Sequence, residues 1–388
     1  MEQRVSVITP GVRDLGAGMR RPLPLILACL ILLGGCTRQA TAQSINDMVS
    51  LPPGFEIEIY ARVQEARTLV AVPELNAVFV GHRRGSSIHA IVDHDRDYRA
   101  DIVRVVKTDL KSPNGIAWKD GYLYVAEQHR LVRFKGPTLD DIRDAEAEVL
   151  FDALPDDSWH GWRYARFGPD GGLFVAVGAP CNICETNGLE GTIVRFDPVT
   201  WQPEIYAAGV RNSVGLDFHP ATGELYFTDN GADNMGDDSP PDELNHAAGP
   251  GRWFGFPWFG GGDHRTDEFE DAPLPREATF PVVAFGAHVA SLGIRFYEGG
   301  MFPADYTGDA FVAQHGSWNR TIPDGYRVVR IRFENGRATG DYEFFADGFL
   351  QSNGAAWGRP VDVQPLDDGS LLVSDDRQGA VYRITYAE

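Results

Sequence analysis

Cysteine is scarce in this 388-residue sequence, which contains only four. Cys29 and Cys36 lie near the N-terminus, so Cys181 and Cys184 form the single pair in the rest of the chain. Glu185 stands where a haem-attachment motif needs histidine, and no second pair completes a zinc site, so both uses are excluded. A local disulfide that pins a loop is the expected use in an oxidising compartment, with a redox-active pair as the alternative.

Positive charge is also scarce. The chain has 35 Lys and Arg against 55 Asp and Glu, a formal net charge of −20, and its basic residues form no block. Binding to the phosphates of a nucleic acid needs a basic face, so nucleic acid is excluded as a partner. In such an acidic chain, places where arginines converge indicate a site for an anionic ligand.

The sequence lacks an apolar run long enough for a permanent membrane span. The apolar run at residues 23–33 follows Arg20 and Arg21 and precedes Gly34-Gly35-Cys36, a pattern typical of signal peptides. Leu33-Gly34-Gly35-Cys36 is typical of a lipobox, which predicts a signal over residues 1–36 and an exported, periplasmic or cell-surface lipoprotein anchored to the membrane only through Cys36. Met19 is an alternative start, and a cleaved signal with a chance cysteine is the alternative interpretation.

Glycine (43), proline (25) and short apolar runs are plentiful, which favours an all-β fold. A turn followed by a short apolar strand recurs six times, at roughly 45- to 60-residue spacing with one longer interval. These strands are Val78–Val80, Tyr122–Val125, Leu173–Val175, Leu225–Phe227, Phe311–Val312 and Leu371–Val373. The repeat predicts a six-bladed β-propeller of four-stranded antiparallel blades over residues 50–388.

Three further segments complete the predicted organisation. The small and polar residues 37–49 are expected to form a tether. The alternating run Phe55–Tyr60 is expected to pair with Val381–Ile384 and close the ring. The long interval from Asp229 to Gly262 is rich in Gly, Asp, Pro and Trp, and such a long loop is expected to be functional rather than decorative.

Propeller topology predicts which side chains converge, because the loops that lead into the blades open on one face around the axis. The residues at this repeat position are Arg67, Asn114, His160, Arg211, Asn212, His288 and Arg359. Arginine presents a planar fork that matches a carboxylate, so several arginines in one pocket favour a small polyanionic ligand. Pairing of each arginine with a neighbouring carboxylate is the alternative.

One stretch carries a specific resemblance. It runs from Gly209-Val210-Arg211-Asn212 through Thr228-Asp229-Asn230-Gly231, followed by Pro240-Pro241-Asp242-Glu243-Leu244-Asn245 and Trp253-Phe254-Gly255-Phe256-Pro257. This stretch resembles the signature region of pyrroloquinoline-quinone-dependent sugar dehydrogenases, and the chain from about Leu51 onward is most similar to their sorbosone dehydrogenase branch.

The resemblance implies a set of roles. His160 matches the catalytic base, Arg211 with Asn212 matches the cofactor-binding pair, and Arg359 matches an arginine on the cofactor carboxylates. Arg320 lies near the family's cofactor lysine, and Asn114 is assigned to the cofactor by its repeat position. The carbonyls of Gly231 and Ala232 match the calcium-binding turn. The implied cofactors are pyrroloquinoline quinone and Ca²⁺, and the implied partners are a sugar or aldehyde substrate and an external electron acceptor, a cytochrome or a quinone.

The sequence departs from the family's glucose dehydrogenases at one position. They place an Asp to orient the histidine, where this chain has Ala179-Pro180-Cys181, so the orienting partner and the sugar specificity are open. The mechanism that the resemblance implies is hydride transfer to the quinone, with Ca²⁺ polarising its carbonyl and a neutral histidine taking the substrate proton.

Two features of the loops have a second interpretation. The acidic residues of the long interval are expected either to hold a structural calcium or to be solvated; they are Asp229, Asp233, Asp237, Asp238, Asp242 and Glu243. The aromatic candidates for stacking on a sugar are Trp253, Phe254, Trp318 and Trp357, with core packing as the alternative. The rival functions are a calcium-dependent lactonase-type hydrolase and a non-catalytic propeller that binds glycans or proteins.

Overall fold

The structure of the protein is a computed structural model that describes residues 45–387. The predicted signal region, Cys36 and residues 37–44 of the predicted tether lie outside these residues. Within the part described, no helix is both long enough and apolar enough to cross a membrane.

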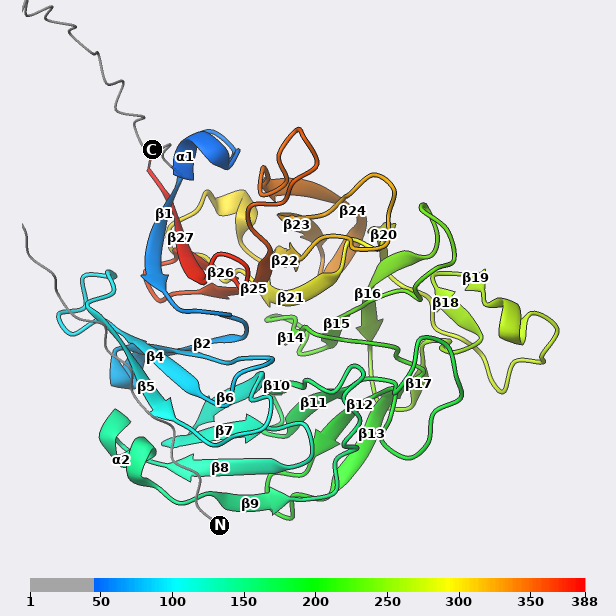
Figure 1. The fold of residues 1–388 in the computed structure, drawn as a ribbon, viewed down its shortest axis with the longest axis horizontal. Helices are drawn as coiled ribbons and strands as arrows, with labels where there is room; N and C mark the ends of the chain where they lie inside the picture. The colour runs from blue at the N-terminus through cyan, green and yellow to red at the C-terminus, as the bar shows by residue number, and fades with distance from the viewer. Residues whose placement is uncertain (1–44, 388) are drawn as a thin grey trace, which may run out of the picture. The chain divides into compact units, whose positions relative to one another are not determined.

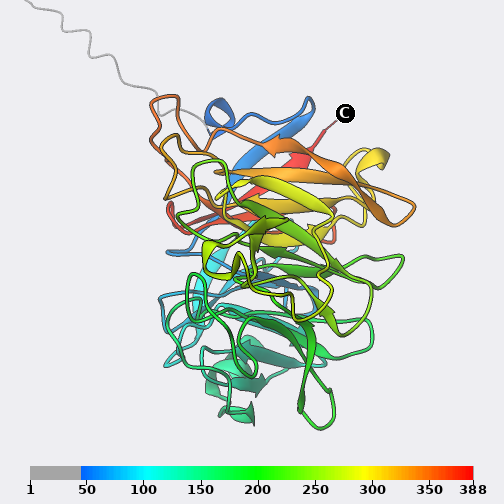
Figure 2. The ribbon, with the colours of Figure 1, turned by 90° about the vertical axis from the view of Figure 1, so that its right-hand side faces the viewer.

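The described residues form six small sheets arranged in a ring, which confirms the predicted six-bladed β-propeller (Figure 1). Seen from the side, the blades succeed one another from teal at the bottom of the view to orange and red at the top (Figure 2). Each blade contains antiparallel strands in consecutive order; blade three adds one parallel strand, and blade six takes its outer strand from the beginning of the ring.

The first three blades follow the chain in order. Their strands are β2 (Leu69–Val72), β3 (Ala77–Val80), β4 (Ile88–Val92) and β5 (Ile102–Lys107) in blade one; β6 (Gly115–Lys119), β7 (Tyr122–Ala126), β8 (Leu131–Lys135) and β9 (Glu148–Phe151) in blade two; and β10 (Tyr164–Phe167), β11 (Leu173–Val177), β12 (Thr192–Phe196), β13 (Pro203–Ala208) and β17 (Arg252–Trp253) in blade three.

The last three blades contain the longer insertions. Their strands are β14 (Leu216–Phe218), β15 (Leu225–Asp229), β16 (Pro241–Ala247) and β20 (Val283–Ala287) in blade four; β21 (Ser291–Phe296), β22 (Ala310–Gln314), β23 (Arg327–Glu334) and β24 (Arg337–Ala346) in blade five; and β25 (Pro360–Pro365), β26 (Leu371–Asp375), β27 (Ala380–Tyr386) and β1 (Phe55–Arg62) in blade six. A small hairpin of β18 (Phe259–Gly261) and β19 (His264–Arg265) lies apart from the blades, and the helices are α1 (Ile45–Met48), α2 (Leu139–Asp144) and three short 3-10 turns at Pro73–Leu75, Asp267–Phe269 and Ala304–Tyr306.

The recurring apolar runs are the second strands of the blades. All residues of β3, β11, β15, β22 and β26 are buried, whereas the fourth strands β5, β13 and β24 are partly exposed. Continuous apolar runs are expected where both faces of a strand pack against neighbouring sheets. The strong sequence signal therefore comes from the strands between two apolar layers.

The ring closes as predicted, because β1 pairs antiparallel with β27 and completes blade six. Phe55 lies opposite Tyr386 and Ile57 opposite Ile384. The Phe55 ring also lies 4.8 Å from that of Phe302 and 5.1 Å from that of Phe345, so it fixes the closing strand to the aromatic core of blade five.

Two details differ from the prediction. Blade three carries a fifth strand, β17, which runs parallel to β13, with Ala207 opposite Arg252. Residues 45–49 of the predicted tether belong to the folded unit, because Ile45–Met48 is a helical turn and Val49 is only 4% exposed and packs in the core.

A buried polar network joins the innermost strands. Asp362 of β25 accepts hydrogen bonds from the hydroxyl of Tyr164 in β10 (3.1 Å) and from the amide of Leu69 in β2 (2.9 Å). Arg295 of β21 donates to the Tyr164 hydroxyl, and the side chains of Arg295 and Asp362 are each 1% exposed. The network therefore ties blades one, three, five and six together at the centre of the ring.

Candidate active site

A cavity of about 430 Å³ opens among the loops that precede the innermost strands. Its wall contains residues from blades one, three, four, five and six, namely Arg67, His160, Arg211, Asn212, His288 and Arg359. The structure thus brings together six of the seven residues expected to converge. Four arginines line this cavity in a protein of net charge −20, once Arg83 is included.

Three predicted site residues do not line the cavity. The Asn114 side chain accepts from Nε of Arg67 (3.1 Å) and donates to the carbonyl of Arg163 (2.6 Å), so it lies behind the wall. Arg320 donates to the Ala287 carbonyl (3.3 Å) and pairs with Asp238 (3.1 Å), which ties it to a neighbouring loop. Ala232 is fully buried, and its amide donates to the Gly260 carbonyl.

His160 lies in the cavity wall with its ring fixed by a backbone carbonyl. Its Nδ1 lies 2.9 Å from the carbonyl oxygen of Ala179, which can only accept a hydrogen bond. Nδ1 therefore carries the proton, and Nε2 keeps the lone pair that a general base needs. The Ala179 carbonyl is thus the orienting partner that the sequence left open.

The environment of His160 favours the neutral ring. Burial lowers the His160 pKa well below its usual value, and the positive charges of Arg211 and Arg83 lower this pKa further. Its backbone is in the left-handed region (φ 49°), a conformation that costs free energy and is concentrated at functional sites. A Cβ at Gly178 would lie 2.5 Å from Cβ of His160, so glycine is needed where these two loops meet.

Arg163 supports the backbone of the His160 loop. Its guanidinium donates to the carbonyls of His160 (3.3 Å), Gln128 (2.9 Å) and Pro155, and the residue is 1% exposed. Burial lowers its pKa to about 10. Arg163 is thus a structural residue that holds the loop carrying the base.

Arg211 is largely engaged by protein groups. It donates to the Asn182 side chain (2.7 Å), the Asn182 carbonyl (3.0 Å), the Asn230 carbonyl (3.1 Å) and Asp233 (2.9 Å). Four of its five N–H groups therefore have partners, which leaves little capacity for a ligand. Pairing with neighbouring groups, the alternative interpretation of the arginines, describes Arg211 well.

Arg359 and Asn212 retain more free capacity. Arg359 donates from Nε to the His315 carbonyl (2.9 Å) and from one terminal nitrogen to the Gly316 carbonyl (2.5 Å), and its other terminal nitrogen has no partner within residues 45–387. The Asn212 side chain likewise has no partner there, because only its backbone is bonded, to Asp229 and Asn230. Both side chains line the cavity and can meet a ligand.

A second histidine in the wall, His315, was missed by sequence analysis. Its Nε2 lies 2.8 Å from Asp376, which also pairs with Arg67 at 2.8 Å. Burial lowers the His315 pKa to about 4. Burial alone would raise the Asp376 pKa, but the hydrogen bonds from His315 and Arg67 and the charge of Arg67 hold it below its usual range. His315 directly follows β22 and so lies outside the repeat position that was searched.

The loop between β11 and β12, residues 178–191, connects three parts of the site. It contains the Cys181–Cys184 disulfide, which is present as predicted. The carbonyl of Ala179 in this loop orients His160, and the oxygen atoms of Asn182 accept from Arg211. The Asn182 side chain also accepts from the amide of Asp233 (2.8 Å) and donates to its carbonyl (3.0 Å). This loop therefore holds the turn around Gly231 against the base.

The acidic residues of the long interval form two sets, a buried one in which Asp229 lies opposite Glu243 and a more exposed one in the loop. Asp229, Asp242 and Glu243 are buried and accept backbone amides, including those of Asn212, Gly231 and Gly262 respectively. Asp233 pairs with Arg211, Asp238 pairs with Arg320, and Asp237 accepts from the amide of Thr321. Within residues 45–387, none of the six acidic residues belongs to a group of three carboxylates with metal-ligand spacing. The structure therefore does not support a calcium site built from these carboxylates.

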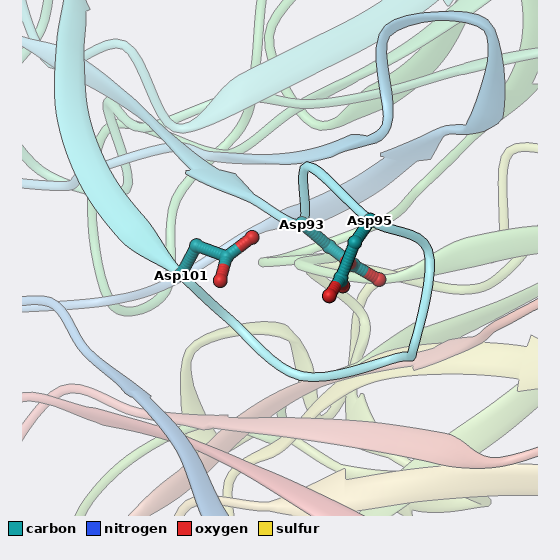
Figure 3. Close-up of side chains that lie close together, drawn as sticks. All are labelled: Asp93, Asp95 and Asp101. Carbon is teal, nitrogen blue, oxygen red and sulfur yellow. The ribbon is translucent and has the colours of Figure 1, made fainter.

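In residues 45–387, the group of carboxylates with such spacing is Asp93, Asp95 and Asp101, in the loop between β4 and β5 (Figure 3). Asp93 accepts from the amides of Arg96 and Tyr98 (both 2.8 Å), and Asp101 accepts from the amide of His94 (2.7 Å). The three side chains do not line the cavity.

The aromatic candidates separate into two groups. Trp253 and Phe254 are buried, and Trp357 stacks on Phe349 at 4.9 Å, so core packing describes these three. Trp318 lines the cavity and is 70% exposed. Trp159, which was not predicted, also lines the cavity and is 52% exposed. These two rings form an accessible aromatic edge of the cavity.

Comparison with known sequences points to one group of proteins. Residues 249–387 match the TrAA12-like family model. An uncharacterized protein of Borreliella burgdorferi is 32% identical over 375 residues, which cover 93% of this chain and 96% of that protein. A pyrroloquinoline quinone-dependent pyranose dehydrogenase of Coprinopsis cinerea is 27% identical over 166 residues, which cover 37% of this chain and only 21% of that longer protein.

Comparison with solved structures shows the same fold. A Trichoderma reesei protein of carbohydrate-active enzyme family AA12 superposes with a TM-score of 0.73 at 19% identity, covering 89% of this chain and all of that one. The quinone-binding domain of the Coprinopsis cinerea pyranose dehydrogenase, in its holo form, gives 0.71 at 18% identity, covering 87% and 97%. A quinone-bound aldose sugar dehydrogenase of Streptomyces coelicolor gives 0.59 at 18% identity, covering 87% and all of that chain.

Proposed function

We propose that this chain, which belongs to the TrAA12-like family of pyrroloquinoline-quinone-dependent sugar dehydrogenase relatives, is a quinoprotein oxidoreductase that oxidises a sugar or a sugar-derived aldehyde or alcohol, such as sorbosone. The observation that carries the proposal is one cavity that holds a neutral histidine with a free Nε2 and arginines with free N–H groups. A base and an anion-binding wall are what a polycarboxylate redox cofactor and a hydroxyl substrate need together.

The free donors fit the quinone. Its carboxylates need charged donors, and Arg359 has an unbonded terminal nitrogen while the Asn212 amide has no partner in the described part of the chain. The volume of about 430 Å³ falls within the range of about 300–1,000 Å³ that is typical of cofactor sites. Arg359 and Asn212 would hold the cofactor, while Arg211 would hold the wall around it.

Calcium is proposed on the chemistry of the turn beside Arg211. Gly231 lines the cavity, and backbone carbonyl oxygens are among the ligands that Ca²⁺ prefers. Ala232 is turned into the protein interior, so Gly231 is the stronger of the two predicted ligands.

The proton of the substrate hydroxyl is taken up by a residue of this chain. When bound, the quinone supplies the electrophilic carbonyl carbon that accepts a hydride from the substrate. Nε2 of His160 takes the proton of the substrate hydroxyl, and the bond to the Ala179 carbonyl keeps this nitrogen free for that task. Trp159 and Trp318 would contact the ring of a sugar at the cavity edge.

The cavity is less suited to the rival functions. A calcium-dependent hydrolase of the lactonase type needs carboxylates that converge on a metal, and Asp233 and Asp242 of this cavity are bonded to Arg211 and to backbone amides. A non-catalytic binding surface gives no reason to bury His160 in a left-handed conformation among arginines.

The cellular setting is proposed from sequence alone. The signal pattern that ends at Cys36 supports export and attachment through a lipid, in the periplasm or at the cell surface. In that setting the electrons would pass to an external acceptor, a cytochrome or a quinone.

The test is reconstitution of the purified apo-protein with pyrroloquinoline quinone and Ca²⁺, followed by dye reduction with a panel of sugars and sugar aldehydes. We expect dye reduction that requires the quinone and is lost on chelation of calcium. Lactone hydrolysis without the quinone would favour the hydrolase, and no binding of the quinone would reject the proposal.

A further inference from the structure

Arg83 lines the cavity from the loop between β3 and β4. Its guanidinium carbon lies 3.5 Å from the centre of the Trp162 ring, close enough for a strong cation–π contact. Within residues 45–387, no oxygen atom accepts a hydrogen bond from this guanidinium. All five of its N–H groups are therefore available to a ligand.

The other arginines of the cavity differ from Arg83 in this respect. Arg67 pairs with Asp376 and Arg211 pairs with Asp233, in each case through an N–O distance below 3 Å. Arg359 lacks a carboxylate partner but donates to two backbone carbonyls. Arg83 has neither kind of direct partner, and the charge of Asp376, which already pairs with Arg67, offsets its charge only in part.

Arg83 is half-buried, and partial burial of an unpaired charge is unfavourable, which is why such guanidinium groups are normally paired. Burial, followed by the repulsion from Arg67, lowers the Arg83 pKa to about 10, which is consistent with a missing counter-ion. The stacking on Trp162 fixes the side chain in the cavity instead of releasing it into water. A retained and immobilised positive charge of this kind suits an anion that binds from outside.

The position of Arg83 limits where that anion lies. Trp162 also packs edge-on against the His160 ring, with 6.1 Å between the ring centres. Arg83 and His160 both line the cavity, and each of them contacts the Trp162 ring. An anion bound by Arg83 would therefore lie beside the base.

We propose that Arg83 is an anion-binding residue of this cavity that pairs with a carboxylate beside His160. The proposal rests on the proposed function for the source of that carboxylate, which is either the quinone cofactor or a sugar acid. A hydrated sugar aldehyde that gives a hydride to the quinone and its hydroxyl proton to His160 becomes a carboxylic acid in place, so a sugar carboxylate is also a product of the proposed reaction. Planar carboxylates match the fork of arginine, and the contact with Trp162 holds that fork in the cavity wall.

The experiment compares wild type with Arg83→Gln and Arg83→Lys, and uses Arg84→Gln as the matched control. Arg84 is the exposed neighbour of Arg83 and does not line the cavity. One arm titrates each apo-protein with pyrroloquinoline quinone at fixed Ca²⁺ and follows its absorbance. The other arm measures the binding of gluconate, with the neutral sorbitol as a size-matched probe, by calorimetry. Thermal unfolding of each variant verifies that it is folded.

We expect Arg83→Gln to weaken one of the two carboxylate ligands at least tenfold, Arg83→Lys to weaken it less, and Arg84→Gln to leave both unchanged. Weaker quinone binding would identify the cofactor as the source, and weaker gluconate binding with unchanged sorbitol binding would identify a sugar acid. Unchanged binding of both ligands in the folded glutamine variant would overturn the proposal and leave Arg83 as a packing partner of Trp162. If that variant does not fold, unchanged binding in Arg83→Lys at raised pH, where lysine is neutral, would overturn it instead. Failure of wild type to bind the quinone rejects the proposed function, while the gluconate arm still tests Arg83.

Discussion

At the scale of single residues, the partner of His160 has a chemical consequence. A carbonyl such as that of Ala179 selects the same tautomer as a carboxylate, but it carries no full charge to stabilise the imidazolium. With Arg211 and Arg83 nearby, the protonated ring is disfavoured further. His160 is thus a weak base that stays unprotonated throughout the neutral pH range and gives up an accepted proton readily.

This predicts an unusual pH dependence of turnover. A histidine whose pKa is lowered stays neutral until the pH falls through that lowered value, so kcat/KM should remain level from about pH 8 to well below the usual histidine pKa of about 6.5. Rates of dye reduction across this range measure it. An inflection at or above pH 6.5 would contradict the assignment of a buried, neutral His160.

The role of His160 is tested by substitution. We expect His160→Gln to leave folding and quinone binding nearly intact while turnover falls by about 10²- to 10⁴-fold, the usual contribution of a positioned base. Turnover, quinone affinity and thermal unfolding should be measured on the same preparation. Joint loss of binding and turnover would indicate a structural role instead.

Arg211 and Arg359 should behave differently although both were predicted to bind the cofactor. Removal of Arg211 takes the charged partner from the half-buried Asp233 and a donor from Asn182, so Arg211→Ala should lower the free energy of unfolding by about 1–3 kcal/mol. Arg359→Ala should mainly weaken quinone binding, by about 2–5 kcal/mol. Denaturant unfolding and quinone titration separate the two effects, and equal loss of stability in both variants would contradict this division.

At the scale of elements, the small disulfide loop is expected to matter more for catalysis than for stability. Cys181 and Cys184 close a loop only three residues apart, so the entropic gain from the cross-link is small. This closed loop contains Asn182 and begins two residues after Ala179, whose carbonyl orients His160, and small displacements of positioning groups can reduce rates strongly.

The prediction is that the double variant Cys181→Ser, Cys184→Ser loses about tenfold in kcat with a nearly unchanged melting temperature. Its pH profile should also move, because a looser Ala179 carbonyl no longer holds the tautomer of His160. A reducing agent should slow the wild type similarly and leave the double variant unaffected. Full turnover in the double variant would show that the disulfide is not needed to position the Ala179 carbonyl and Asn182.

The sequence predicted the strands and part of the site for one reason, which is repetition. Buried second strands such as β3 and β11 are apolar throughout, and the fixed position before each innermost strand brings His160, Arg211 and Arg359 together. A repeat position fixes where a backbone lies and does not fix which way a side chain turns. Asn114 therefore occupies the expected position and yet serves Arg67 and Arg163 behind the wall.

The residues that sequence analysis missed lie outside that repeat position. Arg83 follows β3 and His315 follows β22, at the far ends of second strands, which reach the same face of the ring. The loop after the second strand also borders the cavity, so a search that included it would have found both residues. The carbonyl partner of His160 could not be found in this way, because a backbone group has no sequence signal.

At the scale of the whole molecule, the cavity exists only if the ring is closed, since five blades contribute to its wall. Closure depends on β1, and Phe55 is the residue that contacts the aromatic core. Phe55→Ala should lower the free energy of unfolding by about 3–5 kcal/mol, the usual range for loss of a buried phenylalanine. Denaturant unfolding is the measurement. Glu56→Ala, an exposed neighbour in the same strand, should change it little, and equal effects would contradict the role of Phe55.

The pairing of β1 with β27 also sets an order in time. A ribosome makes β1 early and β27 last, and synthesis of the intervening chain takes tens of seconds at about 5–20 residues per second. Until then the partner of β1 does not exist, and its unpaired edge can bind other strands. A nascent chain therefore needs protection by a chaperone, or by its own delayed collapse, until its final strand emerges.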